Sequence, residues 1–200
     1  MHNIPVKQGN TENLSVIEAI YQRRAVRSYT DEKLTKERIL QLLDAAVQAP
    51  TAMHEEPWQF MVIQDLSVLR RISEAAKKAF AEAPVKPILS GSTLHQRFTS
   101  TDFSIFYNAP TLIIICAKPV GTYAEADCWL AAENLMLAAG AYGLATCVIG
   151  FALPVLNTSE WKKELGLATD SHVVVPIIIG VPSESTAPVA RKKAEILGWK

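Results

Sequence analysis

Apolar positions in the first fifty residues follow the spacing of amphipathic helices. Ser15 and Glu18 match a capping box, and the apolar residues behind them predict a helix over about 16–24. Thr35 is placed to cap a second helix, in which apolar residues recur at helical spacing until Pro50 ends the pattern. Both helices have an apolar face that needs a core to cover it.

Strand-like runs follow, separated by one further helix. Residues 58–64 form a short apolar run of strand character, and a helix capped by Ser67 is predicted over about 67–80. The runs 111–116 and 173–179 are apolar without interruption, which is typical of strands buried on both faces. We therefore expect a buried strand in each of these two runs.

Two longer segments need separate interpretation. Residues 124–141 are apolar or small on almost every side, which predicts a deeply buried helix. The uncharged stretch 135–156 is long enough to mimic a membrane span, but glycines and Pro154 interrupt it, so a buried helix, a turn and a buried strand explain it better. Residues 83–104 contain prolines, glycine and serines without any period, which predicts a long loop or mobile lid.

Composition and charge narrow the class of protein. Helices interleaved with buried strands in 200 residues predict one α+β domain over 1–200. The hydrophobic fraction of 49% is ordinary for a globular protein, and 20 basic side chains balance 20 acidic ones. The net charge is therefore zero, and it provides no general attraction to nucleic acid or to an anionic membrane. Because the N-terminus lacks the pattern of a secretory signal, we expect a cytoplasmic protein.

Several kinds of chemistry lack their sequence signatures. The cysteines Cys116, Cys128 and Cys147 lie far apart in apolar stretches, which favours buried, inert thiols over a disulfide or a zinc site. No second histidine follows His54 at helical spacing, so we predict no metal site. The chain contains no GxGxxG, GxxxxGK[ST], GxSxG or HExxH motif, which excludes a Rossmann nicotinamide site, a triphosphate loop and two hydrolase classes.

Two basic clusters are candidates for binding a phosphate. Arg23 and Arg27 lie four residues apart and would share one side of a helix if the first helix continued. Two guanidinium groups suit a phosphate, although a solvated helix end explains them equally simply. The second cluster, 191–193, follows a stretch rich in proline, serine and threonine, and alone it is more typical of a solvated tail.

Two further segments could meet a ligand through their backbone. The segment 49–58 joins a helix to a strand with two prolines, small residues and His54, and it is either a binding loop or a simple connection. The segment 143–151 leaves the buried helix, runs as a strand and emerges at Gly150. Glycine there would let a flat ring approach the main chain, or it would merely turn the chain.

Taken together and in this order, the four segments resemble the nitroreductase family of FMN-dependent oxidoreductases. The resemblance runs from about Ile17 to Glu195 and is weakest over 83–104. It rests on RRxxRxY from Arg23, on the AP-to-PW loop over 49–58, and on the helix sequence DCWLAAENL leading to Gly143 and Gly150, followed by a late arginine. The resemblance implies a mostly antiparallel sheet flanked by helices, an intertwined homodimer, and one FMN in each of two pockets at the interface.

The resemblance also implies roles for individual residues. Four residues of the first cluster would meet the phosphate, ribityl chain and pyrimidine edge of FMN: Arg23, Arg24, Ala25 and Arg27. Arg191 would complete the phosphate site, and Lys193 would add a further cation to it. The loop residues would come from the partner subunit and line the ring: Pro50, Thr51, Ala52, Met53 and His54. The end of the segment 143–151 would pack beside the isoalloxazine and direct a backbone amide at N5. Its residues there are Val148, Ile149 and Gly150.

The implied activity is hydride transfer from NAD(P)H through FMN to a small organic acceptor, such as a nitroaromatic or a quinone, in a ping-pong cycle. No side chain stands out as an essential acid or base, because the cofactor carries the electrons. This chain has His54 and Glu56 where the family often has Asn and Gln, and Ile149 where some members have glutamate. Enone reduction, reductive dehalogenation, flavin cleavage and a flavin-binding protein without turnover remain alternatives.

Overall fold

The computed structural model describes residues 14–82, 98, 100 and 102–200. Four strands form one sheet in the order β1-β2-β4-β3, and every neighbouring pair runs antiparallel. The strands are β1 (Trp58–Ile63), β2 (Thr111–Ala117), β3 (Ala145–Val148) and β4 (His172–Gly180). The predicted α+β class with an antiparallel sheet is confirmed, and the two uninterrupted apolar runs form its central strands.

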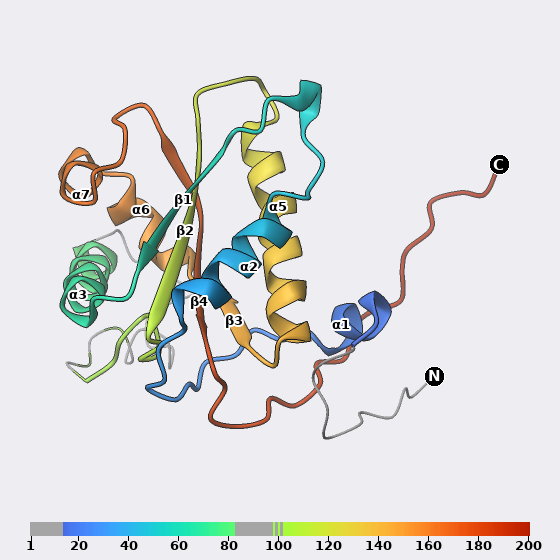
Figure 1. The fold of residues 1–200 in the computed structure, drawn as a ribbon, viewed down its shortest axis with the longest axis horizontal. Helices are drawn as coiled ribbons and strands as arrows, with labels where there is room; N and C mark the ends of the chain where they lie inside the picture. Colours follow the sequence, from blue (N-terminus) through green and yellow to red (C-terminus); the bar gives the residue numbers. More distant parts are fainter. Residues whose placement is uncertain (1–13, 83–97, 99, 101) are drawn as a thin grey trace.

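Helices cover both faces of this sheet (Figure 1). The α-helices are α1 (Val16–Gln22), α2 (Lys36–Ala46), α3 (Leu66–Glu82), α5 (Ala124–Ala141), α6 (Leu153–Leu156) and α7 (Ser159–Glu164). Two short 3-10 helices are η2 (Ala52–His54) and η3 (Gly150–Ala152). Helices α2 and α5 lie on one face, and α3, α6 and α7 lie on the other. None of the helices in the described part of the chain is long and apolar enough to cross a membrane.

Alternation along β2 divides the core into two layers. Ile113 and Ile115 pack on the side of α2 and α5, while Leu112 and Ile114 pack on the side of α3 and α6. All four side chains are fully buried. Burial on both faces explains why this strand shows no alternation of apolar and polar residues in the sequence.

The helix starts show which capping predictions were correct. The capping box of Ser15 and Glu18 is present, with both of its hydrogen bonds formed, and Thr35 caps α2 through the N–H of Arg38. The cap predicted at Ser67 is wrong, because Asp65 fills that role: its carboxylate accepts from the N–H groups of Ser67 and Val68. The hydroxyl of Ser67 also donates to this carboxylate, and this hydrogen bond first, with the two backbone ones, lowers the pKa of Asp65.

Helix α5 is less buried than its apolar sequence predicts. One side packs into the core, but Trp129 and Leu130 on the other side remain about half exposed. The exposed apolar groups of α1, which packs against α5, include Ile17 and Tyr21. An apolar helix with only one covered side indicates that a further surface belongs against it.

Strand β3 forms one edge of the sheet and leads toward the candidate site. The segment after α1 runs extended beside it, with a bridge between Ala25 and Thr146 in which the N–H of Val26 donates to the carbonyl of Thr146 at 3.0 Å. A second bridge joins Tyr29 to Pro182. The lid predicted over 83–104 lies mostly outside the described residues.

Candidate functional site

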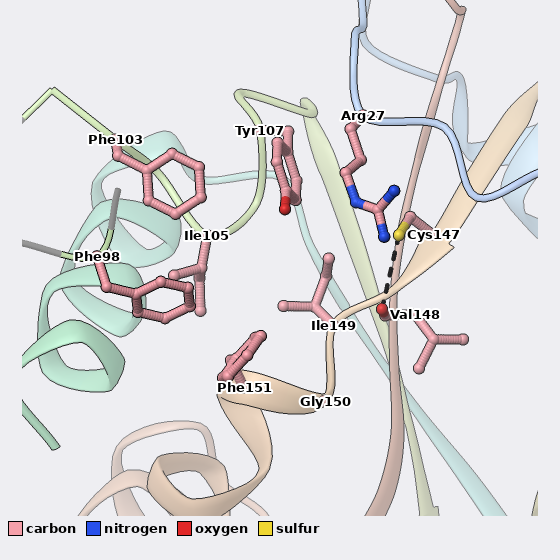
Figure 2. A pocket seen from close by; sticks show the side chains of 10 residues that line it. All are labelled: Arg27, Phe98, Phe103, Ile105, Tyr107, Cys147, Val148, Ile149, Gly150 and Phe151. Atoms are coloured by element: carbon pink, nitrogen blue, oxygen red, sulfur yellow. Dashed lines mark hydrogen bonds between the residues drawn. The ribbon is translucent and has the colours of Figure 1, made fainter. Parts of the chain in front are cut away.

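A pocket of about 320 Å³ opens where β3 ends and η3 begins. Figure 2 shows the residues that line it, from the basic segment, from the chain before β2, and from β3 and η3. They are Arg27, Phe98, Phe103, Ile105, Tyr107, Cys147, Val148, Ile149, Gly150 and Phe151. The structure therefore brings four of the residues expected at the site, Arg27 and 148–150, into one cavity.

Arg27 reaches this pocket from an extended segment and not from a helix. Helix α1 ends at Gln22, and Arg23 already has the extended backbone angle ψ of 131°. The condition under which Arg23 and Arg27 would share one side of a helix is therefore not met. The guanidinium carbon of Arg27 lies 5.7 Å from the centre of the Tyr107 ring, which places a cation at one end of an aromatic wall.

The backbone at Gly150 faces open space. A Cβ built on Gly150 would meet no atom within 4 Å, and the residue does not adopt the left-handed conformation that requires glycine. A turn alone would therefore tolerate other residues at this position. The observation favours the interpretation in which glycine lets a flat group approach the main chain.

Arg23 and Arg24 line a separate hollow of about 230 Å³ beside the end of α5. The Arg23 side chain forms an ion pair with Glu133 at 3.2 Å, so a carboxylate already balances this cation. Arg24 donates to the backbone carbonyls of Tyr21 and Arg23 at 2.7 and 2.8 Å. The Nε of Arg24 is buried and has no hydrogen-bond partner among the described residues. Ala25, between these arginines and Arg27 in the sequence, is exposed.

The loop around η2 lies away from this pocket, beside the N-terminal end of α5 (Figure 1). Pro50 is exposed, Thr51 and Ala52 are half-buried, and the Met53 side chain is 88% exposed. Met53 and His54 have positive φ angles of 53° and 57°, a region that costs energy for residues other than glycine. Within one chain, the structure does not bring 50–54 to the pocket.

The C-terminal residues also lie apart from the pocket. After Pro182 the chain leaves the sheet and runs past α1 without helix or strand (Figure 1). Arg191 and Lys193 are exposed on this tail, which also carries the exposed Leu197 and Trp199. The single chain therefore does not join the late arginine to the first basic cluster.

Most of the aromatic wall was not identified from the sequence. Phe98 lies 4.5 Å from Phe151 and 5.6 Å from Phe103 between ring centres, and Phe103 meets Tyr107 edge-on at 5.5 Å. Phe98 and Phe103 fall in the region interpreted as a loop with few large apolar groups. The run of apolar and aromatic residues over 103–107 was the available signal.

The pocket also contains a thiol. Cys147 lines the cavity and donates through its Sγ to the carbonyl of Val148 at 3.6 Å. Burial raises the pKa of Cys147, although Arg27 counteracts this in part. The thiol therefore stays protonated near neutral pH and is a weak nucleophile. In the described part of the chain, no three histidine, cysteine or carboxylate side chains gather to hold a metal ion.

Comparison with known proteins supports a common origin for this arrangement. The family model described as "Nitroreductase family" matches residues 20–181. A crystal structure of a nitroreductase with bound FMN from Bacteroides fragilis is 28% identical, covers 93% of this chain and 97% of its own, and superimposes with a TM-score of 0.74.

Two curated relatives extend the comparison. A nitrobenzene nitroreductase from Ectopseudomonas oleovorans is 28% identical over 80% of this chain and 84% of its own length. An iodotyrosine deiodinase from Thermotoga neapolitana is 26% identical over 82% of this chain and 86% of its own. Because the family model covers most of the chain and the fold agrees with it, the protein belongs to the nitroreductase family.

Proposed function

We propose that this protein is an FMN-dependent oxidoreductase that transfers hydride from NAD(P)H to a small organic acceptor by a ping-pong mechanism. The observation that carries the proposal is the single cavity in which Arg27 and the chain around Gly150 meet. The similar proteins support the same chemistry, since they include a nitrobenzene nitroreductase and a nitroreductase with bound FMN.

The cavity fits part of a flavin. Its aromatic walls suit a planar ring, Arg27 supplies a positive charge at one end, and the open space at Gly150 gives such a ring access to the backbone. At about 320 Å³ the cavity suits the ring better than the whole of FMN, so the phosphorylated chain must extend beyond it. The neighbouring hollow with Arg23 and Arg24 lies along the same extended segment.

The basic segment would then bind FMN along its length. Arg27 would meet the pyrimidine edge, and Ala25 would leave room for the ribityl chain. The buried Nε of Arg24 has an unused donor, which suits an anionic oxygen better than an empty cavity. Arg23 would exchange part of its contact with Glu133 for the phosphate.

The rest of the site would come from a second copy of the chain. The half-exposed side of α5 with Trp129 and Leu130 gives the homodimer an apolar surface. The exposed, strained loop 50–54 of the partner subunit would cover the ring. The tail of the partner subunit would bring Arg191 and Lys193 to the phosphate. A site shared in this way explains why one chain leaves these residues far from the pocket.

When bound, FMN supplies the site at which hydride is accepted and released. Arg27 would hold a fixed positive charge where negative charge develops on reduction. The N–H of Ile149 is already bonded to the carbonyl of Pro176 at 2.9 Å, so the donor directed at N5 would be the N–H of Gly150, at the start of η3. NAD(P)H and the organic acceptor would bind in turn at the same open face of the flavin.

The absorption spectrum of the purified protein tests this proposal. We expect a flavin band near about 450 nm that bleaches on addition of NADH or NADPH and returns when a nitroaromatic or quinone is added. A bound flavin that never bleaches would indicate a flavin-binding protein without turnover. A protein that takes up no FMN would contradict the proposal.

Reductive dehalogenation is the second candidate, favoured by the similarity to the iodotyrosine deiodinase from Thermotoga neapolitana. The two activities can be distinguished by reducing the protein under anaerobic conditions and then adding each substrate. Release of iodide from an iodotyrosine faster than reduction of nitrobenzene would favour the deiodinase chemistry. The reverse order would favour the nitroreductase chemistry.

A further inference from the structure

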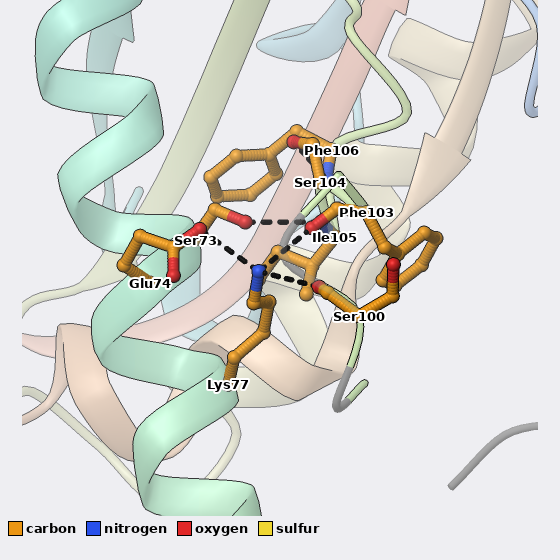
Figure 3. A network of polar contacts seen from close by, with 8 residues as sticks. All are labelled: Ser73, Glu74, Lys77, Ser100, Phe103, Ser104, Ile105 and Phe106. Atoms are coloured by element: carbon orange, nitrogen blue, oxygen red, sulfur yellow. Dashed lines mark hydrogen bonds and ion pairs between the residues drawn. The ribbon is translucent and has the colours of Figure 1, made fainter. Parts of the chain in front are cut away.

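A buried lysine lies behind the aromatic wall of the pocket. Lys77 on α3 has a side chain only 8% exposed, and its ammonium group donates to Glu74 at 2.9 Å and to the backbone carbonyls of Ser100 and Phe103 at 3.0 and 3.1 Å (Figure 3). A buried cation is costly unless each of its donors is satisfied. Two of its three partners belong to the segment that leads into β2.

Ser73 provides a second anchor from the same helix. It lies one turn before Lys77, so the two side chains share one face of α3. The buried hydroxyl of Ser73 accepts from the N–H of Ile105 at 3.1 Å (Figure 3). Helix α3 therefore holds the carbonyl of Phe103 and the amide of Ile105, on either side of Ser104.

The anchored segment has little regular structure of its own. Among its described residues, the internal backbone hydrogen bonds are short-range, from Tyr107 to Ser104 and from Ala109 to Phe106. Tyr107 and Asn108 have positive φ angles of 51° and 57°. Strained residues of this kind keep their conformation only where the surroundings impose it. The anchors on α3 therefore help to decide where this segment lies.

This segment supplies the pocket with Phe103, Ile105 and Tyr107. A displacement of the Phe103 carbonyl would move its ring, and the Tyr107 ring that packs edge-on against it would follow. Tyr107 in turn faces Arg27. Contacts therefore connect Lys77 to the cation of the site, although Lys77 does not line the pocket.

We propose that Lys77 is a positioning residue that, together with Ser73, fixes the aromatic wall against which the isoalloxazine ring of FMN packs. This inference rests on the proposed function, because it takes FMN as the occupant of the pocket. It assigns to α3, a helix with no residue in the pocket, control over how tightly and in what surroundings the ring is held.

Lys77→Met tests the proposal, because methionine keeps the apolar stem and removes the ammonium. We expect FMN affinity, measured by fluorescence titration, to fall roughly tenfold, because without the ammonium the wall would hold its binding position in only about a tenth of the molecules. Bound FMN should also fluoresce more strongly than in the wild type, because the wall no longer packs closely on it. Lys78→Met is the matched control: the Lys78 side chain is 77% exposed on the same helix, and both readouts should stay at wild-type values.

The fluorescence of bound FMN separates positioning from a general loss of stability. Weaker binding with unchanged fluorescence of the bound flavin would indicate a merely structural role and would overturn the proposal, as would wild-type affinity in Lys77→Met. Hydrogen exchange without FMN gives a further readout: the amide of Ile105 should exchange at least several-fold faster than in the wild type, while amides in β2 keep their rates. An unchanged Ile105 amide would overturn the proposal.

Ser73→Ala carries the same test if Lys77→Met does not fold. It removes one hydroxyl, and we expect the same direction of change in FMN affinity, fluorescence and Ile105 exchange; wild-type values would overturn the proposal. The two proposals fail differently. A wild-type protein that takes up no FMN overturns both, whereas normal FMN uptake with unaffected variants overturns only the role of Lys77 and Ser73.

Discussion

The backbone N–H of Ala52 donates a hydrogen bond to the buried carboxylate of Asp127 at 3.1 Å, which ties the strained loop around η2 to the first turns of α5. Asp127→Ala should leave this amide without its partner and cost about 1–3 kcal/mol in the free energy of unfolding. Urea denaturation measures the loss. Asp127→Asn is the control, since its amide oxygen can still accept; a loss as large as that of alanine would show that this hydrogen bond matters little.

Arg27 is expected to contribute to FMN binding and not to folding. Its side chain is exposed, lies over the ring of Tyr107 and forms no ion pair with the described residues, so Arg27→Ala should keep the thermal midpoint and weaken FMN binding about tenfold or more. Fluorescence titration measures the affinity. Arg38→Ala provides a matched control, because Arg38 lies over the ring of Tyr142 outside the pocket. Equal FMN affinity in the two variants would count against our assignment of Arg27.

Gly150 offers a graded test of access to the ring. The free space around its Cβ position means that Gly150→Ala and Gly150→Val should both fold without FMN. We expect flavin content after purification to fall with side-chain size and to be lowest for valine, because the branched side chain occupies the place of the ring. Full flavin loading of the valine variant would mean that Gly150 does not face the cofactor.

The half-exposed side of α5 should control assembly. Leu130→Glu places a charge on the apolar side of α5, so the variant should elute as a monomer while the wild type elutes as a dimer. Size-exclusion chromatography with light scattering distinguishes the two. Because the site is proposed to be shared, the monomer should also lose its FMN. A dimeric Leu130→Glu protein would place the interface elsewhere.

Buried thiols should limit stability at high pH. Burial raises the pKa of Cys116 to about 11 and of Cys128 to about 12, against an ordinary value of 9.0. Since the folded-state pKa values are the higher ones, the stability contributed by the protonated thiols is complete below pH 9 and is lost as pH rises through about 11 to 12. Urea denaturation at increasing pH should show this decline. Cys128→Ala should decline less steeply, and an identical slope would exclude a contribution from Cys128.

The sequence predicted those elements that have a local cause. The runs 111–116 and 173–179 became β2 and β4, because strands buried on both faces need apolar residues at every position. The helix 124–141 was predicted with its observed bounds, but its burial was overestimated. Periodicity shows that a face is apolar and does not show whether the same chain or another one covers it.

The site was harder to predict because its parts meet only in the folded chain. Arg23 and Arg27 would share one side of a helix only if α1 continued, but α1 stops at Gln22 and the segment pairs with β3. Local sequence cannot specify such a tertiary pairing. For the same reason, no sequence pattern singles out Lys77, whose ammonium group meets backbone carbonyls only in the folded chain.

The extended segment beside β3 has a consequence for solubility. An unprotected edge strand can recruit a strand from another molecule, and here the backbone of Val26 already occupies the carbonyl of Thr146. The segment that we propose to bind FMN thus also shields the edge of the sheet against unwanted strand addition. Substitutions that displace this segment should therefore have two effects together: loss of FMN and self-association into insoluble material.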